Sequence, residues 1–291
     1  MQKVKVETLI WDCDNTIWIH RKDEVELISK HLEIEDVATL KVQFFQWIKN
    51  FNDFFEERLV TTGRIEKFVE RNMPILEAYN ISAGKFLKEM AEVETSFLNN
   101  EAIETLKYFY GEGYKNIVLT DWIAKTQLKL LKKYDILQYF EEIHTCDEFY
   151  IKKNPRAKER VIKEGKEDSY IMIGDSLESD IAFANVAGIK SIWYNRNESK
   201  NNTKFVPTYE IRSMKELYEI IEWLKRCKWL YLAAYSVLKI YEQKFEKTSK
   251  KLLTNWKKEY KICSTKANKN LQKQNFIKEW LTWVYFQIKI M

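Results

Sequence analysis

The stretch LIWDCDNTIW, residues 9–18, places two carboxylates, Asp12 and Asp14, one residue apart after an apolar run. The residues that precede them, 8–11, have the pattern of a buried strand. Two like charges this close destabilise each other unless a cation or a shared proton relieves them. Ligands of open α/β sheets bind at the carboxyl ends of the strands, so this pair is a candidate ligand site. An acidic turn would use the same residue types, and the rest of the chain decides between the two.

Strand and helix patterns alternate in most of the chain before residue 226. Four more short apolar runs have strand character, at residues 116–119, 142–145, 170–173 and 190–194. Helical patterns lie between them, as at residues 124–133 and 154–163. This alternation predicts βαβ units and a Rossmann-like, three-layer α/β core with a parallel sheet.

The interval from about residue 19 to residue 104 shows no convincing strand pattern. Large apolar residues recur there at helical spacing, namely Phe44, Trp47, Ile48, Phe51, Phe54 and Phe55. We therefore predict an all-helical cap over residues 19–104, inserted after the first strand of a core made of residues 1–18 and 105–225. These aromatic side chains either form the cap's own core or line a substrate pocket, and the sequence leaves both open.

Composition limits the class of protein. Of the 291 residues, 45% are hydrophobic and 31% are charged, as in ordinary globular proteins. No apolar run reaches the roughly 18 residues that a membrane-spanning helix needs. The four cysteines lack CxxC spacing and there are three histidines, which disfavours a zinc cluster. With no secretory signal pattern at its start, the chain is expected to be reduced and cytoplasmic.

Three further stretches could bind a phosphate or a metal. The second strand ends in Thr120 and Asp121, which suit a small anion site but also a helix cap. The sequence KKNP, residues 152–155, offers a lysine near a helix start, although a pair of lysines is more often solvated. The sequence GDSLESD, residues 174–180, supplies Asp175 and Asp180, and facing the first acid pair they would form an oxygen-rich pocket suited to Mg²⁺.

Together these stretches resemble the haloacid dehalogenase-like hydrolase superfamily over residues 1 to about 225. The family's four motifs are matched in order by Asp12, Asp14 and Thr16; by Thr120; by a lysine; and by Gly174, Asp175 and Asp180. Lys152 fits the KxxP spacing of the third motif, and Lys153 stays a competitor. The helical insertion is similar to the family's cap of the first type, which covers the site and selects the substrate.

The resemblance implies roles for these residues. Asp12 would be the nucleophile that forms an aspartyl-phosphate, and Asp14 the general acid and base. Thr120, the amide of Asp121 and the lysine would hold the phosphoryl oxygens. The implied metal set is Asp12, Asp14 through its backbone carbonyl, Asp175, and Asp180 as an orienting or outer ligand.

We therefore expect a Mg²⁺-dependent phosphatase that acts on a small phosphorylated substrate. Asp14 argues against the family's dehalogenases, which lack that acid. A phosphotransferase or mutase would share the chemistry, so the sequence leaves that alternative open.

Residues 226–291 lie outside the resemblance and differ in character. They hold 15 Lys and Arg against 4 Asp and Glu, with no glycine or proline. Apolar residues recur there at helical spacing, as at Trp229, Leu232 and Val237, which predicts a basic helical extension that packs on the core or on a second subunit. Lysine interleaved with Trp and Tyr is also typical of binding to nucleic acid, and an anionic membrane surface is a further alternative. A nucleic-acid- or partner-binding factor, or an oligomer, is thus the second hypothesis.

Overall fold

The computed structural model describes residues 6–147 and 149–226. These fall into two compact units, one of residues up to 207 with 211–217, the other of residues 208–210 with the described residues from 218. The site described below lies in the first unit. The predicted extension, residues 226–291, lies outside the described residues except for Arg226. Within the described part of the chain, no helix is long and apolar enough to cross a membrane.

The sheet is built outward from the strand that the opening stretch predicts. β1 (Thr8–Trp11) is fully buried and pairs in parallel with β4 (Lys115–Leu119) on one side and β6 (Tyr170–Gly174) on the other. β5 (Glu142–His144) pairs with β4, and β7 (Lys190–Tyr194) pairs with β6. With β8 (Tyr209–Ile211) the order is β5-β4-β1-β6-β7-β8. A continuous apolar run fits β1 because a central parallel strand is covered on both faces.

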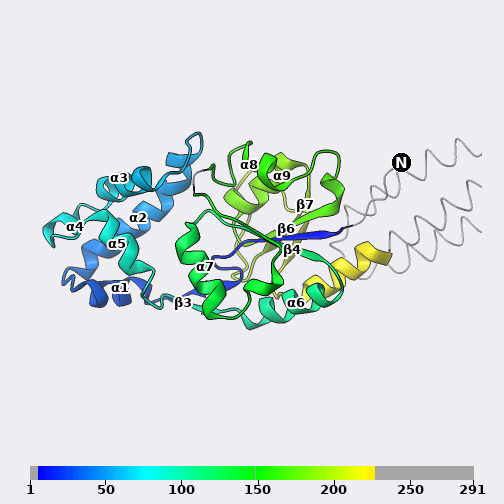
Figure 1. The fold of residues 1–291 in the computed structure, drawn as a ribbon, viewed down its shortest axis with the longest axis horizontal. Coiled ribbons are helices and arrows are strands. Elements are labelled where there is room, and N and C mark those ends of the chain that lie inside the picture. The colour runs from blue at the N-terminus through cyan, green and yellow to red at the C-terminus, as the bar shows by residue number, and fades with distance from the viewer. Residues whose placement is uncertain (1–5, 148, 227–291) are drawn as a thin grey trace, which may run out of the picture. The chain divides into compact units, whose positions relative to one another are not determined.

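Helices connect the parallel strands and cover the sheet. α6 (Asn100–Gly111) and α7 (Ala124–Lys133) lie on one side of it, and α8 (Ala157–Val161) and α9 (Ala182–Ala187) on the other (Figure 1). Right-handed crossovers require the two pairs of helices to lie on opposite faces of the sheet. The chain first moves from β1 through β4 to β5, and then crosses to β6 and β7 on the other side of β1, so the direction of the crossovers reverses. The three-layer α/β core and the predicted strands are confirmed, the latter to within one residue at their ends.

The helix predicted over residues 154–163 is shorter in the structure. Asn154 Oδ1 accepts a hydrogen bond from the amide of Arg156 at 2.9 Å, and this side-chain turn delays the helix to Ala157. At the other end Ile162 is extended and Gly165 has a φ of 73°. Two 3₁₀ turns, η1 (Leu137–Tyr139) and η2 (Glu167–Ser169), precede β5 and β6.

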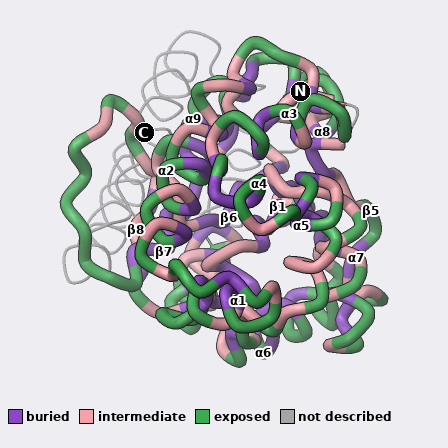
Figure 2. The backbone as a smooth tube through the Cα atoms, turned by 90° about the vertical axis from the view of Figure 1, so that its left-hand side faces the viewer, coloured by how far each residue is buried: buried purple, intermediate pink, exposed green. Residues whose placement is uncertain are grey.

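Five helices form the insertion, and they gather together in Figure 1. They are α1 (Glu24–Leu32), α2 (Val37–Phe55), α3 (Thr62–Asn72), α4 (Ile75–Ala78) and α5 (Ala83–Met90). α2 starts where Asp36 accepts the Thr39 amide at 3.0 Å. Its buried aromatic residues recur every three or four positions, and the same alternation of buried and exposed residues marks the cap helices in Figure 2.

Two short strands, which the sequence did not predict, lie at the ends of this insertion. β2 (Trp18–His20) and β3 (Ser96–Leu98) pair antiparallel, with Trp18 opposite Leu98. Asn99 donates its amide to the carbonyl of Ile17 at 2.9 Å and extends the pairing. The chain therefore leaves and re-enters the core through a hydrogen-bonded ribbon.

Candidate active site

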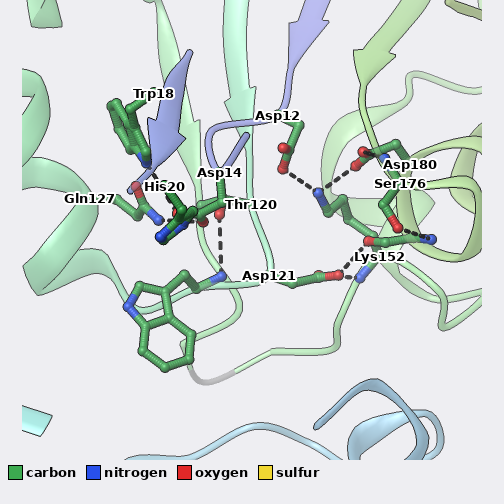
Figure 3. A network of polar contacts seen from close by, with 12 residues as sticks. Asp12, Asp14, Trp18, His20, Thr120, Asp121, Gln127, Lys152, Ser176 and Asp180 are labelled. Atoms are coloured by element: carbon green, nitrogen blue, oxygen red, sulfur yellow. Dashed lines mark hydrogen bonds and ion pairs between the residues drawn. The ribbon is translucent and has the colours of Figure 1, made fainter. Parts of the chain in front are cut away.

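Three of the sequence motifs meet at one edge of the sheet. β4, β1 and β6 are neighbours, so Thr120, Asp12 and Asp175 follow adjacent strand ends. The amide of Asp12 still donates to the carbonyl of Ile173 at 2.9 Å, which holds it in line with β6. Figure 3 shows the polar contacts that result.

Lys152 joins the first and last motifs through two buried ion pairs. Its Nζ lies 2.6 Å from Asp12 Oδ1 and 2.5 Å from Asp180 Oδ1, and all three side chains are buried (Figure 3). Burial alone would lower the pKa of Lys152, but the charges of Asp12 and Asp180 outweigh it and raise that pKa well above its ordinary value. Lys152 is therefore a fixed positive charge beside Asp12.

Lys153, the alternative that the sequence left open, lies elsewhere. Its Nζ pairs with Asp53 and Glu56 at the C-terminal end of α2, at 3.4 and 3.3 Å. Both partners are substantially exposed, so these pairs contribute little to stability. Of the two lysines, only Lys152 is brought to Asp12.

Three carboxylates form a group that fits a divalent cation. Asp12, Asp175 and Asp180 each offer one oxygen, all within 4.8 Å of one another. Asp12 Oδ2 is buried and has no hydrogen-bond partner among the described residues. Burial, reinforced by the charge of Asp180, raises the pKa of Asp12 well above its usual range and that of Asp175 to about 7. Mg²⁺ prefers hard oxygen ligands such as these carboxylates, and its charge would relieve the repulsion between them.

Asp180 is the most constrained of the three. Its Oδ1 is tied to Lys152, and its Oδ2 accepts the amide of Ser176 at 2.9 Å. A Cβ added at Gly174 would lie 2.1 Å from Asp180 Oδ2, so only glycine allows this approach. Asp180 belongs to a single π-helical turn, η3 (Leu177–Ile181), a form that is often found at functional sites. With both oxygens engaged, Asp180 is placed to position Lys152.

The carboxylate of Asp14 has a separate set of contacts. It accepts hydrogen bonds from Trp18 Nε1 at 3.1 Å and Gln127 Nε2 at 2.9 Å, and it pairs with His20 Nε2 at 3.1 Å (Figure 3). The turn that sends it away from Asp12 includes a left-handed residue, Asn15, with a φ of 57°.

Charge and hydrogen bonding favour the ionised form of Asp14. Burial would raise its pKa, but the hydrogen bonds from His20 and Trp18 outweigh this and lower it. Burial likewise lowers the pKa of His20, yet its hydrogen bonds to Asp14 and Glu24 raise it to about 10. The two carboxylates of the first motif thus lie in different environments.

The second motif forms a turn and does not cap the helix that follows. Thr120 Oγ1 accepts the amide of Trp122 at 3.2 Å, whereas the N-cap residue of α7 is Ile123, which makes no side-chain cap bond. The carboxylate of Asp121 accepts the amide of Lys152 at 2.7 Å and the hydroxyl of Ser179 at 2.6 Å. The sequence assigned a role only to the amide of Asp121, and the structure adds that its carboxylate holds the loop that carries Lys152.

Three contact residues were missed or undervalued in the sequence. Gln127 and Ser179 were not singled out, and a buried glutamine on an amphipathic helix is the one signal that could have marked Gln127. His20 and Arg21 come just after the first motif, where the sequence indicates either pocket residues or, more simply, the start of the cap linker. In the structure His20 contacts Asp14, whereas Arg21 pairs with exposed Asp23.

The carboxylates and Lys152 described above line a cavity of about 450 Å³. Its polar side includes Asp12, Asp14, Lys152, Asp175 and Asp180. Its other side is apolar and comes from the cap helices, chiefly Phe44, Phe45, Trp47, Ile48, Phe51, Leu87 and Met90. The cap aromatics therefore serve both predicted uses, since Phe44, Trp47 and Phe51 also belong to the buried core of the cap.

Mg²⁺ is expected to raise the melting temperature of the protein at pH 8 by about 5 °C or more at a hundredfold excess over its Kd. Between about pH 4 and pH 7 the folded metal-free protein keeps a proton on Asp175 that the unfolded chain has lost. Its stability therefore falls as the pH rises through that window, and a bound cation offsets the loss. Thermal denaturation at pH 5 and pH 8, with Mg²⁺ or chelator, measures this effect.

Asp175→Asn should stabilise the metal-free protein at pH 8 and remove most of the response to Mg²⁺. Asp168→Asn makes the same change at an exposed carboxylate and should leave the response intact. An equal Mg²⁺ shift in wild type and Asp175→Asn would contradict the metal assignment.

Comparisons with known proteins agree with this architecture. The family model described as haloacid dehalogenase-like hydrolase matches residues 6–188. The HAD-hydrolase YfnB of Bacillus subtilis is 26% identical over 241 residues, which cover 75% of this chain and 96% of YfnB. A glyceraldehyde 3-phosphate phosphatase of Pyrococcus furiosus is 24% identical over 238 residues, covering 76% and 95%. The crystal structure of YfnB bound to magnesium superposes with a TM-score of 0.58 at 21% identity, covering 75% of this chain and 99% of that one, and shows the same fold.

Proposed function

The chain belongs to the haloacid dehalogenase-like hydrolases, and from this premise we propose that it is a Mg²⁺-dependent phosphatase that cleaves a phosphomonoester through an aspartyl-phosphate. The observation that carries the proposal is the position of Asp12, which Lys152 holds through one oxygen and whose other oxygen has no partner in the described part of the chain. The phosphatase from Pyrococcus furiosus, matched over nearly its whole length, supports the reaction class.

Asp12 and Asp175 would hold the cation, with the backbone carbonyl of Asp14 as the further ligand that the family resemblance implies. Asp180 would act through Lys152, since both of its oxygens are already engaged. When bound, Mg²⁺ would neutralise the repelling carboxylates and withdraw charge from a phosphoryl oxygen.

The residues of this chain would then act in two steps. A carboxylate oxygen of Asp12 forms a bond to phosphorus as the bond from phosphorus to the ester oxygen breaks, and the departing oxygen takes a proton from Asp14. In the second step Asp14 removes a proton from water, whose oxygen bonds to phosphorus and frees Asp12. Lys152 stabilises charge on the phosphoryl oxygens, together with Thr120 and the amide of Asp121.

The contacts of Asp14 support its separate role. Trp18, His20 and Gln127 converge on this carboxylate and fix it apart from the group around Lys152. Their hydrogen bonds favour its ionised form, which activates water in the second step, so the first step draws on the minor, protonated form of Asp14. A phosphotransferase would share the first step and differ only in the acceptor.

Asp14→Asn is expected to lower Mg²⁺-dependent phosphate release from an alkyl phosphate by about 100-fold. The loss in the first step should be smaller with 4-nitrophenyl phosphate, because its leaving oxygen needs little help from an acid. Burst kinetics on both esters, with Mg²⁺ and with chelator, separate the two steps. Because both esters are measured on the same variant, the first-step rate with one ester is the control for the first-step rate with the other. An equal first-step loss on both esters would exclude Asp14 as the acid, and release that survives chelation would exclude the metal.

A further inference from the structure

Part of the apolar wall of the cavity is exposed, where a folded protein would ordinarily bury it. Phe45 and Ile48 of α2 are 46% and 47% exposed, and both line the cavity. Buried Leu87 and half-buried Met90 of α5 continue the same wall. Large apolar side chains that gather at a concave surface mark a place where a ligand contributes the missing contacts.

The charges around the cavity are unfavourable for a second anionic group. Among the described residues that line it, carboxylates outnumber basic groups, and the basic ones are Lys152 and His20. Lys152 is paired with Asp12 and Asp180, while His20 bridges two other carboxylates. No arginine is among these lining residues, and the cap helices contribute no lysine to them. A carboxylate or second phosphate on the ligand would therefore lie unpaired beside acids.

One neutral polar group interrupts the apolar wall. Asn52, one turn beyond Ile48 on α2, lines the cavity, and its side chain makes no hydrogen bond to another described residue. Its amide offers both a donor and an acceptor. The wall can thus recognise an apolar group that carries an uncharged polar edge.

We propose that α2 selects phosphomonoesters whose organic group is uncharged and largely apolar, such as one with a ring, and that it rejects esters with a second anionic group. This inference depends on the proposed phosphatase activity, which supplies the measurement. Specificity here comes from a feature that rejects as well as one that attracts, because the described residues of this wall offer apolar contact and include no cation that is free of an ion pair.

Three esters with similar leaving oxygens test the selection. Benzyl phosphate presents an apolar ring, 4-carboxybenzyl phosphate adds one anionic group to it, and glycerol 3-phosphate replaces the ring with hydroxyls. The wild-type kcat/KM is expected to favour benzyl phosphate over each of the others by about tenfold or more, with Mg²⁺ present.

A pair of variants on α2 locates the selection in the wall. Ile48→Lys places a cation in the cavity, and its half-exposed position should tolerate lysine. The preference for benzyl over 4-carboxybenzyl phosphate should then shrink by about tenfold. Val42→Lys makes the same charge change on the same helix at a residue that is 71% exposed and outside the lining, and it should leave the preference unchanged.

The outcomes separate the inference from the activity. Equal wild-type efficiency on the three esters, or an equal shift in both variants, would overturn the selection by α2 while leaving the phosphatase standing. The wild-type comparison does so even where a variant fails to fold. Absence of Mg²⁺-dependent release from all three esters and from 4-nitrophenyl phosphate would overturn the phosphatase itself.

Discussion

Asp12→Asn is expected to reduce kcat by about 10⁴-fold or more on every phosphomonoester that the wild type cleaves. An amide cannot form the aspartyl-phosphate, and no other carboxylate can replace Asp12 in place. Asp180 has both oxygens engaged, and Asp14 is held by three other side chains. Phosphate release under saturating substrate measures the loss, and intact-protein mass after rapid quenching should show a phosphoryl adduct only in the wild type.

A folded, inactive variant is the result that supports the role of Asp12. Removing this carboxylate should not lower the melting temperature of the metal-free protein at neutral pH, because burial and Asp180 disfavour its charge. Asp168→Asn makes the same chemical change at an exposed residue and should keep full activity. An Asp12→Asn protein within tenfold of wild type would rule out the aspartyl-phosphate at this position.

Most of the core could be predicted because its strands are short apolar runs that end in chemically distinctive residues. β1 is a continuous apolar stretch followed by Asp12 and Asp14, and β6 is a second apolar stretch, followed directly by Asp175. Adjacent parallel strands bring their carboxyl ends together whatever the loops between them do. The meeting of Asp12, Thr120 and Asp175 therefore follows from topology, and topology follows from the alternating pattern.

The ribbon of β2 and β3 could not be predicted in the same way. Each strand has three residues, too few for a period of two to be recognised, and their partners are more than seventy positions apart in the chain. The contacts of Asp14 with His20 and Gln127 depend on that ribbon and on the start of α7. Such contacts are set by tertiary packing, and no local pattern encodes them.

The choice between Lys152 and Lys153 could not be made from the sequence and required the structure. Neighbouring residues in an irregular loop point in directions that no periodicity fixes. The structure fixes them through Asp121, which accepts the amide of Lys152 and so turns its side chain toward Asp12. Lys153 then points to the cap.

Lys152→Met is expected to lower kcat/KM by about 10³-fold, while Lys153→Met should change it by less than about threefold. Lys152 is the only basic side chain in contact with Asp12 among the described residues, and its loss leaves buried carboxylates facing one another. Raising the Mg²⁺ concentration should restore folding of Lys152→Met more than it restores activity, since the cation offsets repulsion but does not hold the phosphoryl oxygens. Melting temperature and kcat/KM measured over the same Mg²⁺ series separate these two effects. If Lys153→Met lost activity and Lys152→Met kept it, the ion pairs around Asp12 would be structural, and the catalytic lysine would be the one that faces the cap.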